Sequence, residues 1–164
     1  SAGAAAGGCA HVVPAAPPWA PTAELVLQLC DEVQQQIASL TLSDALMLAR
    51  ALARLRPVAT SPLTVELLVA EVMRELHVLR PDQLCDALVS FTRLRVVQDG
   101  FLHSMSRATI AKLPDASPKD VSVSIHAFAK AEFRDDRIFA EAAAQMSRDF
   151  IGFHPREVVL GLWA

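Results

Sequence analysis

The chain has 164 residues, of which 52% are hydrophobic and 20% are charged, and its formal net charge is −3. A negative balance gives no overall attraction to nucleic acid, so such binding would need a local cluster of cations. The apolar content is high for a free-standing soluble protein and predicts that partners, or further parts of a larger body, cover some of the surface. Three cysteines without framework spacing indicate a reducing compartment rather than a disulfide scaffold. We find no apolar run long enough to span a bilayer.

Residues 1–21 differ in composition from the rest of the chain. They contain no Asp, Glu, Lys or Arg and are rich in Ala, Gly and Pro, so they cannot bury enough apolar surface to offset the entropy of ordering. We expect a disordered or extended head over 1–21 and a folded part over 22–164. The first residue is not Met, and removal of an organellar transit peptide is one explanation, partial coverage of the protein being the other.

A helical segment is predicted from Thr22 to Leu40, with Glu24 in its first turn. We interpret it as the second helix of an incomplete repeat. The next predicted helix begins at Ser43 and ends at Arg56, because the residue before Pro57 is pushed out of the helical region.

Copies of this second segment return about every 37 residues. Each copy has a bulky apolar residue, which we call the anchor, with another apolar residue three positions before it. Successive anchors are separated by 39, 37 and 35 residues, and they are Leu52, Phe91, Phe128 and Trp163. A fixed period in this range is typical of stacked helix pairs. The predicted fold is therefore all-α, an α-solenoid of antiparallel helix pairs with incomplete first and last repeats.

Second helices are predicted between the copies, over 62–77, 98–113 and 135–150. Proline marks the start of several helices, as in Ser61-Pro62, Arg80-Pro81 and Ser117-Pro118, since proline is favoured at the first helical position. The last predicted helix follows His154-Pro155 and is rich in apolar residues, so we expect further protein or a partner to cover that end of the array.

The sequence carries no recognisable catalytic chemistry. It has no nucleophile and base arrangement, no phosphate-binding glycine loop and no Cys/His cluster at metal-ligand spacing. Cys9 and His11 alone are too few ligands for a metal site. We predict a non-enzymatic protein with no metal, no cofactor and no small-molecule substrate.

A cation recurs at one position of the repeat. Arg54, Arg93 and Lys130 each lie two residues after an anchor, and such a row could follow a phosphate backbone. A second row, Arg56 and Arg95, is broken by Glu132. The alternative is that each cation only complements the dipole at the end of its helix. The complete set of candidate RNA contacts is Arg50, Arg54, Arg56, Arg93, Arg95, Lys130 and Arg134.

The repeated segments 43–55, 80–94 and 117–130 resemble the helical repeats of about 37 residues, called heptatricopeptide or octotricopeptide repeats, that accompany FASTK-like and RAP-domain proteins of mitochondria and plastids. The resemblance covers about residues 41–164. It implies an α-solenoid that acts in organellar RNA metabolism, translation or ribosome assembly, or that has become a structural protein of a divergent mitochondrial ribosome. No RAP domain is visible in the sequence.

Two functional hypotheses follow from this resemblance. The first is a non-catalytic, RNA-contacting component of an organellar ribosome or RNA-processing machinery, in mitochondria or alternatively in plastids. The second is a protein-only scaffold or accessory subunit of a large organellar complex. The implied partners are neighbouring proteins of a large assembly and, in the first hypothesis, a ribosomal RNA backbone.

Overall fold

The computed structural model describes residues 22–36, 39–55 and 60–164. Within these ranges the chain forms eight α-helices, short 3-10 turns and no β-strand, which confirms the all-α prediction. The helices are α1 (Ala23–Gln36), α2 (Leu42–Arg54), α3 (Pro62–Arg74), α4 (Pro81–Arg93), α5 (Asp99–Lys112), α6 (Pro118–Lys130), α7 (Asp136–Arg148) and α8 (Pro155–Trp163), and the 3-10 turns are η3 (Leu113–Asp115) and η4 (Phe150–Gly152).

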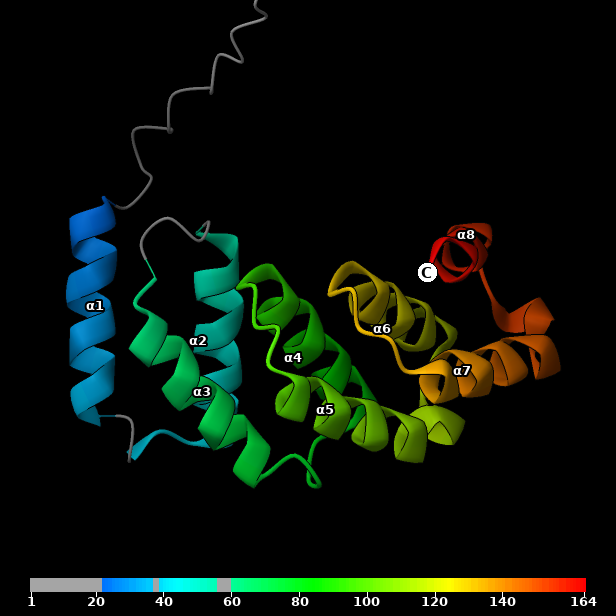
Figure 1. Ribbon diagram of the computed structural model, residues 1–164, viewed down its shortest axis with the longest axis horizontal. Coiled ribbons are helices and arrows are strands. Elements are labelled where there is room, and N and C mark those ends of the chain that lie inside the picture. The colour runs from blue at the N-terminus through cyan, green and yellow to red at the C-terminus, as the bar shows by residue number, and fades with distance from the viewer. Residues whose placement is uncertain (1–21, 37–38, 56–59) are drawn as a thin grey trace, which may run out of the picture.

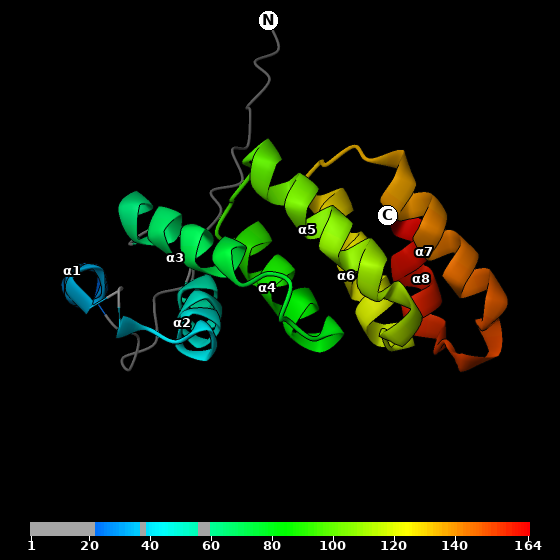
Figure 2. The same cartoon turned by 90° about the horizontal axis from the view of Figure 1, so that it is seen from below.

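The helices are arranged in two rows (Figures 1 and 2). Contacts of α4 with α2 and α6, and of α6 with α8, form one row, which we call the A row. Contacts of α3 with α1 and α5, and of α5 with α7, form the second, the B row. Each A helix from α2 to α6 also packs against the B helix that follows it in the chain. The core therefore runs along the whole stack rather than forming one central cluster.

Equivalent helices begin at regular intervals. In the A row the starts are Leu42, Pro81, Pro118 and Pro155, separated by 39, 37 and 37 residues. In the B row the starts at Ala23, Pro62, Asp99 and Asp136 have the same three separations. The second helices, predicted over 62–77, 98–113 and 135–150, are shorter in the structure: α3 ends at Arg74, α5 at Lys112 and α7 at Arg148.

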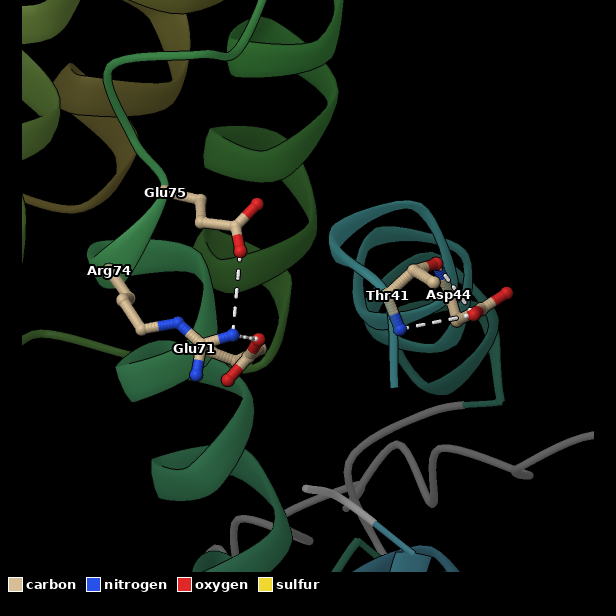
Figure 3. A network of polar contacts seen from close by, with 5 residues as sticks. All are labelled: Thr41, Asp44, Glu71, Arg74 and Glu75. Atoms are coloured by element: carbon tan, nitrogen blue, oxygen red, sulfur yellow. Dashed lines mark hydrogen bonds and ion pairs between the residues drawn. The ribbon is translucent and has the colours of Figure 1, made fainter. Parts of the chain in front are cut away.

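Local side-chain bonds set where several helices begin. Helix α2 begins at Leu42, one residue before the predicted start at Ser43, and Thr41 caps it. The Thr41 hydroxyl oxygen accepts from the Asp44 amide at 3.2 Å, and the Thr41 amide donates to the Asp44 carboxylate, as Figure 3 shows. This reciprocal pair satisfies two amides that no helical carbonyl can reach. Arg74, in the last turn of α3, forms ion pairs with Glu71 and Glu75 (Figure 3), and it lies where a cation complements the helix dipole.

Three of the four predicted anchors occupy equivalent core positions. Leu52 is 4% exposed and Phe91 and Phe128 are 0% exposed, and each is ten residues after the first residue of its helix. The assignment of Trp163 as an anchor is wrong. This side chain is 65% exposed and lies only eight residues after Pro155, so its equivalent in the preceding repeat is His126 rather than Phe128.

The physical reason for this error is a shift in register. The anchors were aligned by side-chain size, and the only bulky aromatic residue of α8 is Trp163, although the helix begins two residues too late for it to reach the anchor position. Its ring rests instead on the His126 imidazole, with ring centroids 4.7 Å apart.

Candidate functional site

The repeated cations lie along one edge of the A row. Arg54, Arg93 and Lys130 are the last residues of α2, α4 and α6, and all three side chains are exposed. Because these helices are equivalent members of the stack, their carboxyl ends lie on the same edge, and neighbouring helices in such a stack are about 8–10 Å apart. The last helical turn is also where a cation stabilises the helix dipole.

A shared backbone motif continues this edge beyond α4 and α6. Arg95 and Glu132 are equivalent residues, and both have positive φ angles, of 60° and 55°. The amide of the residue after each donates back to the anchor carbonyl, from Val96 to Phe91 at 3.0 Å and from Phe133 to Phe128 at 3.1 Å. This Schellman motif satisfies carbonyls at the helix end and turns the side chain of the left-handed residue outward.

The apolar half of the motif fixes the anchors. Val96 and Phe133 are 6% exposed, and the ring of Phe133 packs on that of Phe128 with centroids 5.5 Å apart. A hydrophobic contact of this kind commonly accompanies a Schellman motif. The anchor residues therefore determine where the cations that follow them are placed.

A groove of about 530 Å³ lies between the ends of α4 and α6. Three of the candidate cations line it, and Glu132 is the one acidic residue in the lining. The complete lining is Thr92, Arg93, Arg95, Val96, Val97, Lys130, Ala131 and Glu132. All four charged side chains are exposed, and none of them forms an ion pair with another residue of the ranges that the structure describes. The groove therefore presents an excess of positive charge to solvent.

Two further grooves adjoin this central groove. One of about 280 Å³ shares Arg95, Val96 and Val97 with it and extends to the start of α3. The other, of about 410 Å³, shares Glu132 and reaches Arg134 at the start of α7. Asp135 and Asp136 also line that third groove, so its charge is negative overall. The positive surface is thus centred on α4 and α6 and ends before α7.

Asp135 has a structural role at this acidic end. Its carboxylate accepts a hydrogen bond from the buried Ser106 hydroxyl at 2.7 Å and another from the Arg137 amide at 3.1 Å, which caps α7. The hydrogen bond from the Ser106 hydroxyl makes the largest contribution to lowering the pKa of Asp135. These bonds favour the charged form of the carboxylate, which accepts them as the cap of α7.

The remaining candidates are placed differently. Arg50 does not join the groove, and its guanidinium pairs with the Asp86 carboxylate of α4 at 3.3 Å, with both side chains more than half exposed. Arg54 is exposed on α2 but does not line the central groove. Arg56 lies outside the described residues, as do the predicted head over 1–21 and the Cys9 and His11 pair.

Thr92, Val96 and Val97 also belong to this surface, although the sequence patterns did not predict them there. Thr92 has a buried hydroxyl oxygen without a hydrogen-bond partner among the described residues, and Val97 is 64% exposed. A usable signal was present, since all three residues flank the repeated cations. Val97 supplies an apolar wall that only the fold brings next to α6.

Burial raises the pKa of the Cys85 thiol to about 11, so this cysteine is a neutral core residue and a poor nucleophile. Within the described ranges no cluster of three His, Cys, Asp or Glu side chains could hold a metal ion. None of the helices described is long and apolar enough to cross a membrane.

No protein-family model matches this chain, and no curated protein matches it at a significant level.

Proposed function

We propose that the protein is a non-catalytic helical-repeat component of an organellar ribosome or RNA-processing machinery, and that it binds a short stretch of RNA backbone in the central groove. The place of action that we propose is the mitochondrion, with the plastid as the alternative. The proposed role and the proposed place of action both draw on the resemblance of the repeats to the organellar 37-residue repeats.

One observation carries the proposal: Arg93, Arg95 and Lys130 converge on one open groove in a chain whose net charge is −3. A dispersed excess of cations would attract RNA without positioning it. A groove with three cations and one acid offers a local site for a few phosphates despite the overall negative charge. Arginine also presents a planar fork of donors that matches phosphate oxygens.

The helix-dipole explanation predicts a different balance of effects. If the cations served only the ends of α4 and α6, reversal of their charge would lower stability by about 0.3–1 kcal/mol at each position and leave RNA binding unchanged. If they bind phosphates, RNA affinity falls at temperatures at which the protein is still folded. The two explanations are therefore separated by measuring stability and affinity on the same variant.

The test is the triple variant R93E/R95E/K130E, with single-stranded RNA binding measured by fluorescence anisotropy at several salt concentrations. We expect an affinity loss of at least about tenfold, and a slope of log K against log salt that is smaller in magnitude by about 2, since each single-strand phosphate contact contributes roughly 0.7. Unchanged affinity and slope would refute the proposal.

The matched control is a second triple variant that has the same change in net charge but substitutes cations outside the groove. Arg107, Lys119 and Arg137 are exposed, and none of them lines the central groove. R107E/K119E/R137E replaces two arginines and one lysine, as the test variant does. We expect it to bind RNA more tightly than the groove variant, and equal losses would point to net charge alone.

The protein-only scaffold remains the second candidate because apolar side chains are exposed at one end of the stack. Phe150 is 61%, Ile151 99% and Leu162 82% exposed. Such a surface favours a protein neighbour over RNA. Substitutions in the groove that leave RNA affinity unchanged would favour this second function.

A further inference from the structure

The two ends of the helix stack have complementary shapes, and this complementarity points to a partner. Three of the B helices, α3, α5 and α7, bury the same two positions. Their third and seventh residues are at most 3% exposed, and these residues are Thr64, Leu68, Phe101, Met105, Ile138 and Ala142. The ring of Phe101 contacts that of Phe91, with centroids 5.1 Å apart, so this face packs on the A helix that precedes it.

In helix α1 the third and seventh residues are exposed instead of buried. It belongs to the B row, and its third and seventh residues are Leu25 and Leu29. These side chains are 46% and 54% exposed, whereas Val26 and Cys30, on the side that contacts α3, are 4% and 1% exposed. Within the described part of the chain, α1 is thus a B helix that lacks an A helix in front of it.

At the opposite end of the stack, an apolar groove has no helix packed on it in the described part of the chain. A groove of about 420 Å³ lies between α7 and α8, with Phe139, Met146, Phe150, Val158 and Leu162 in its lining. The residues 37 positions earlier are Leu102, Thr109, Leu113, Val121 and Ile125, and all five are at most 6% exposed. α7 contacts the elements that carry them, namely α5, η3 and α6. The groove is therefore the surface that α7 covers one repeat earlier, and here no helix in the described part of the chain covers it.

We propose that α1 of a second copy of this chain occupies the groove, so that copies associate head to tail. α1 has 14 residues and α7 has 13, so the occupant has the right length. Leu25 and Leu29 take the positions that Ile138 and Ala142 hold in α7. One contact thereby covers both exposed faces and completes a helix pair from α8 and the partner's α1.

Arginine side chains lie where the acidic residues of α1 would be placed. α1 carries Glu24, Asp31 and Glu32 and no Lys or Arg. In the position equivalent to α7, its carboxyl end comes next to the end of α7 and the start of α8, where Arg148 and Arg156 are exposed. Glu157 and Asp149 are the acids at that end, and the Glu157 carboxylate is engaged by the His154 amide at 2.7 Å. The groove proposed for this association and the groove proposed for RNA share no lining residue.

A head-to-tail contact joins two different surfaces, so it leaves a free surface at each end of a dimer and permits longer chains. This property gives a decisive test by analytical ultracentrifugation. We expect the weight-average mass of the 164-residue chain to rise with concentration. Leu29→Glu blocks only the α1 face and Leu162→Glu blocks only the groove, so each variant alone is expected to be a monomer.

An equimolar mixture of the two variants is expected to form a complex with twice the mass of one chain, because each retains the surface that the other has lost. Val78→Glu is the control, since Val78 is 60% exposed and lies between α3 and α4, away from both ends of the stack, and this variant should associate like the unsubstituted chain. Circular dichroism checks that helicity is retained, and Leu29→Gln replaces Leu29→Glu if it is not.

Several results would overturn the proposal. A chain that stays monomeric at all concentrations does not use a second copy to cover the two faces. Association that survives Leu29→Glu does not use α1, and a mixture that stays monomeric excludes the head-to-tail contact. Loss of association in Val78→Glu would show that the self-association is non-specific.

Discussion

Phe128→Ala and Trp163→Ala test the register of the repeats, because equal effects are expected if both residues are anchors and very different effects if Trp163 is equivalent to His126. Phe128 is fully buried, contacts Phe133 and accepts the hydrogen bond that closes the Schellman motif through its backbone carbonyl. Trp163 is 65% exposed and has the His126 ring as its aromatic contact.

The expected magnitudes follow from burial. Truncation of a buried Phe to Ala costs about 3–5 kcal/mol through lost transfer free energy and the cavity left behind. Trp163 loses a partly exposed ring contact worth about 0.5–1.5 kcal/mol. For a chain of this size roughly 2–4 °C of melting temperature is lost per kcal/mol, so we expect a decrease of about 6–20 °C for Phe128→Ala and at most about 6 °C for Trp163→Ala.

The assay is urea and thermal unfolding followed by the helical circular dichroism signal, repeated at two protein concentrations so that association does not enter the comparison. Phe91→Ala is the positive control, since Phe91 is also 0% exposed and additionally contacts Phe101. A Trp163→Ala variant that loses as much stability as Phe128→Ala would contradict the register in which Trp163 is equivalent to His126.

Three further results are expected. Glu132→Gly should raise stability by about 1 kcal/mol in urea unfolding, because glycine adopts the positive φ of 55° without the steric cost of a side chain; a loss would show that the Glu132 side chain makes a stabilising contact. Asp135→Ala should lower stability by about 1 kcal/mol through loss of the α7 cap. Because the pKa of Asp135 is lowered in the fold, the carboxylate stabilises the protein above the unfolded pKa of about 3.9, and this stabilisation is lost as the pH falls below that value. The stabilities of wild type and variant should therefore converge in acid. Cys85, with its pKa raised to about 11 and its side chain buried, should react with iodoacetamide far more slowly in the native protein than in urea at pH 8, as mass spectrometry of the Cys85 peptide would reveal; equal rates would contradict the burial.

Local signals in the sequence determined the helical elements. Helix starts at Ser61-Pro62, Arg80-Pro81 and Ser117-Pro118 were predicted because proline is favoured at the first helical position, and the structure begins α3, α4 and α6 at those prolines. The anchors Leu52, Phe91 and Phe128 were predicted from apolar spacing, which depends only on helical geometry. The common position of Arg54, Arg93 and Lys130 at helix ends followed in the same way.

Contacts between repeats were decided by the tertiary structure alone. Side-chain size suggested Trp163 as a fourth anchor, but the anchor position depends on where α8 begins relative to α6. The pairing of Arg50 with Asp86 joins two helices, so no pattern within either helix predicts it. Likewise, the amphipathic pattern of α1 does not distinguish Leu25 and Leu29 from Val26 and Cys30. Which of these residues is buried depends on which neighbouring helix is present to cover it, and a sequence pattern specifies an apolar face without specifying what packs against it.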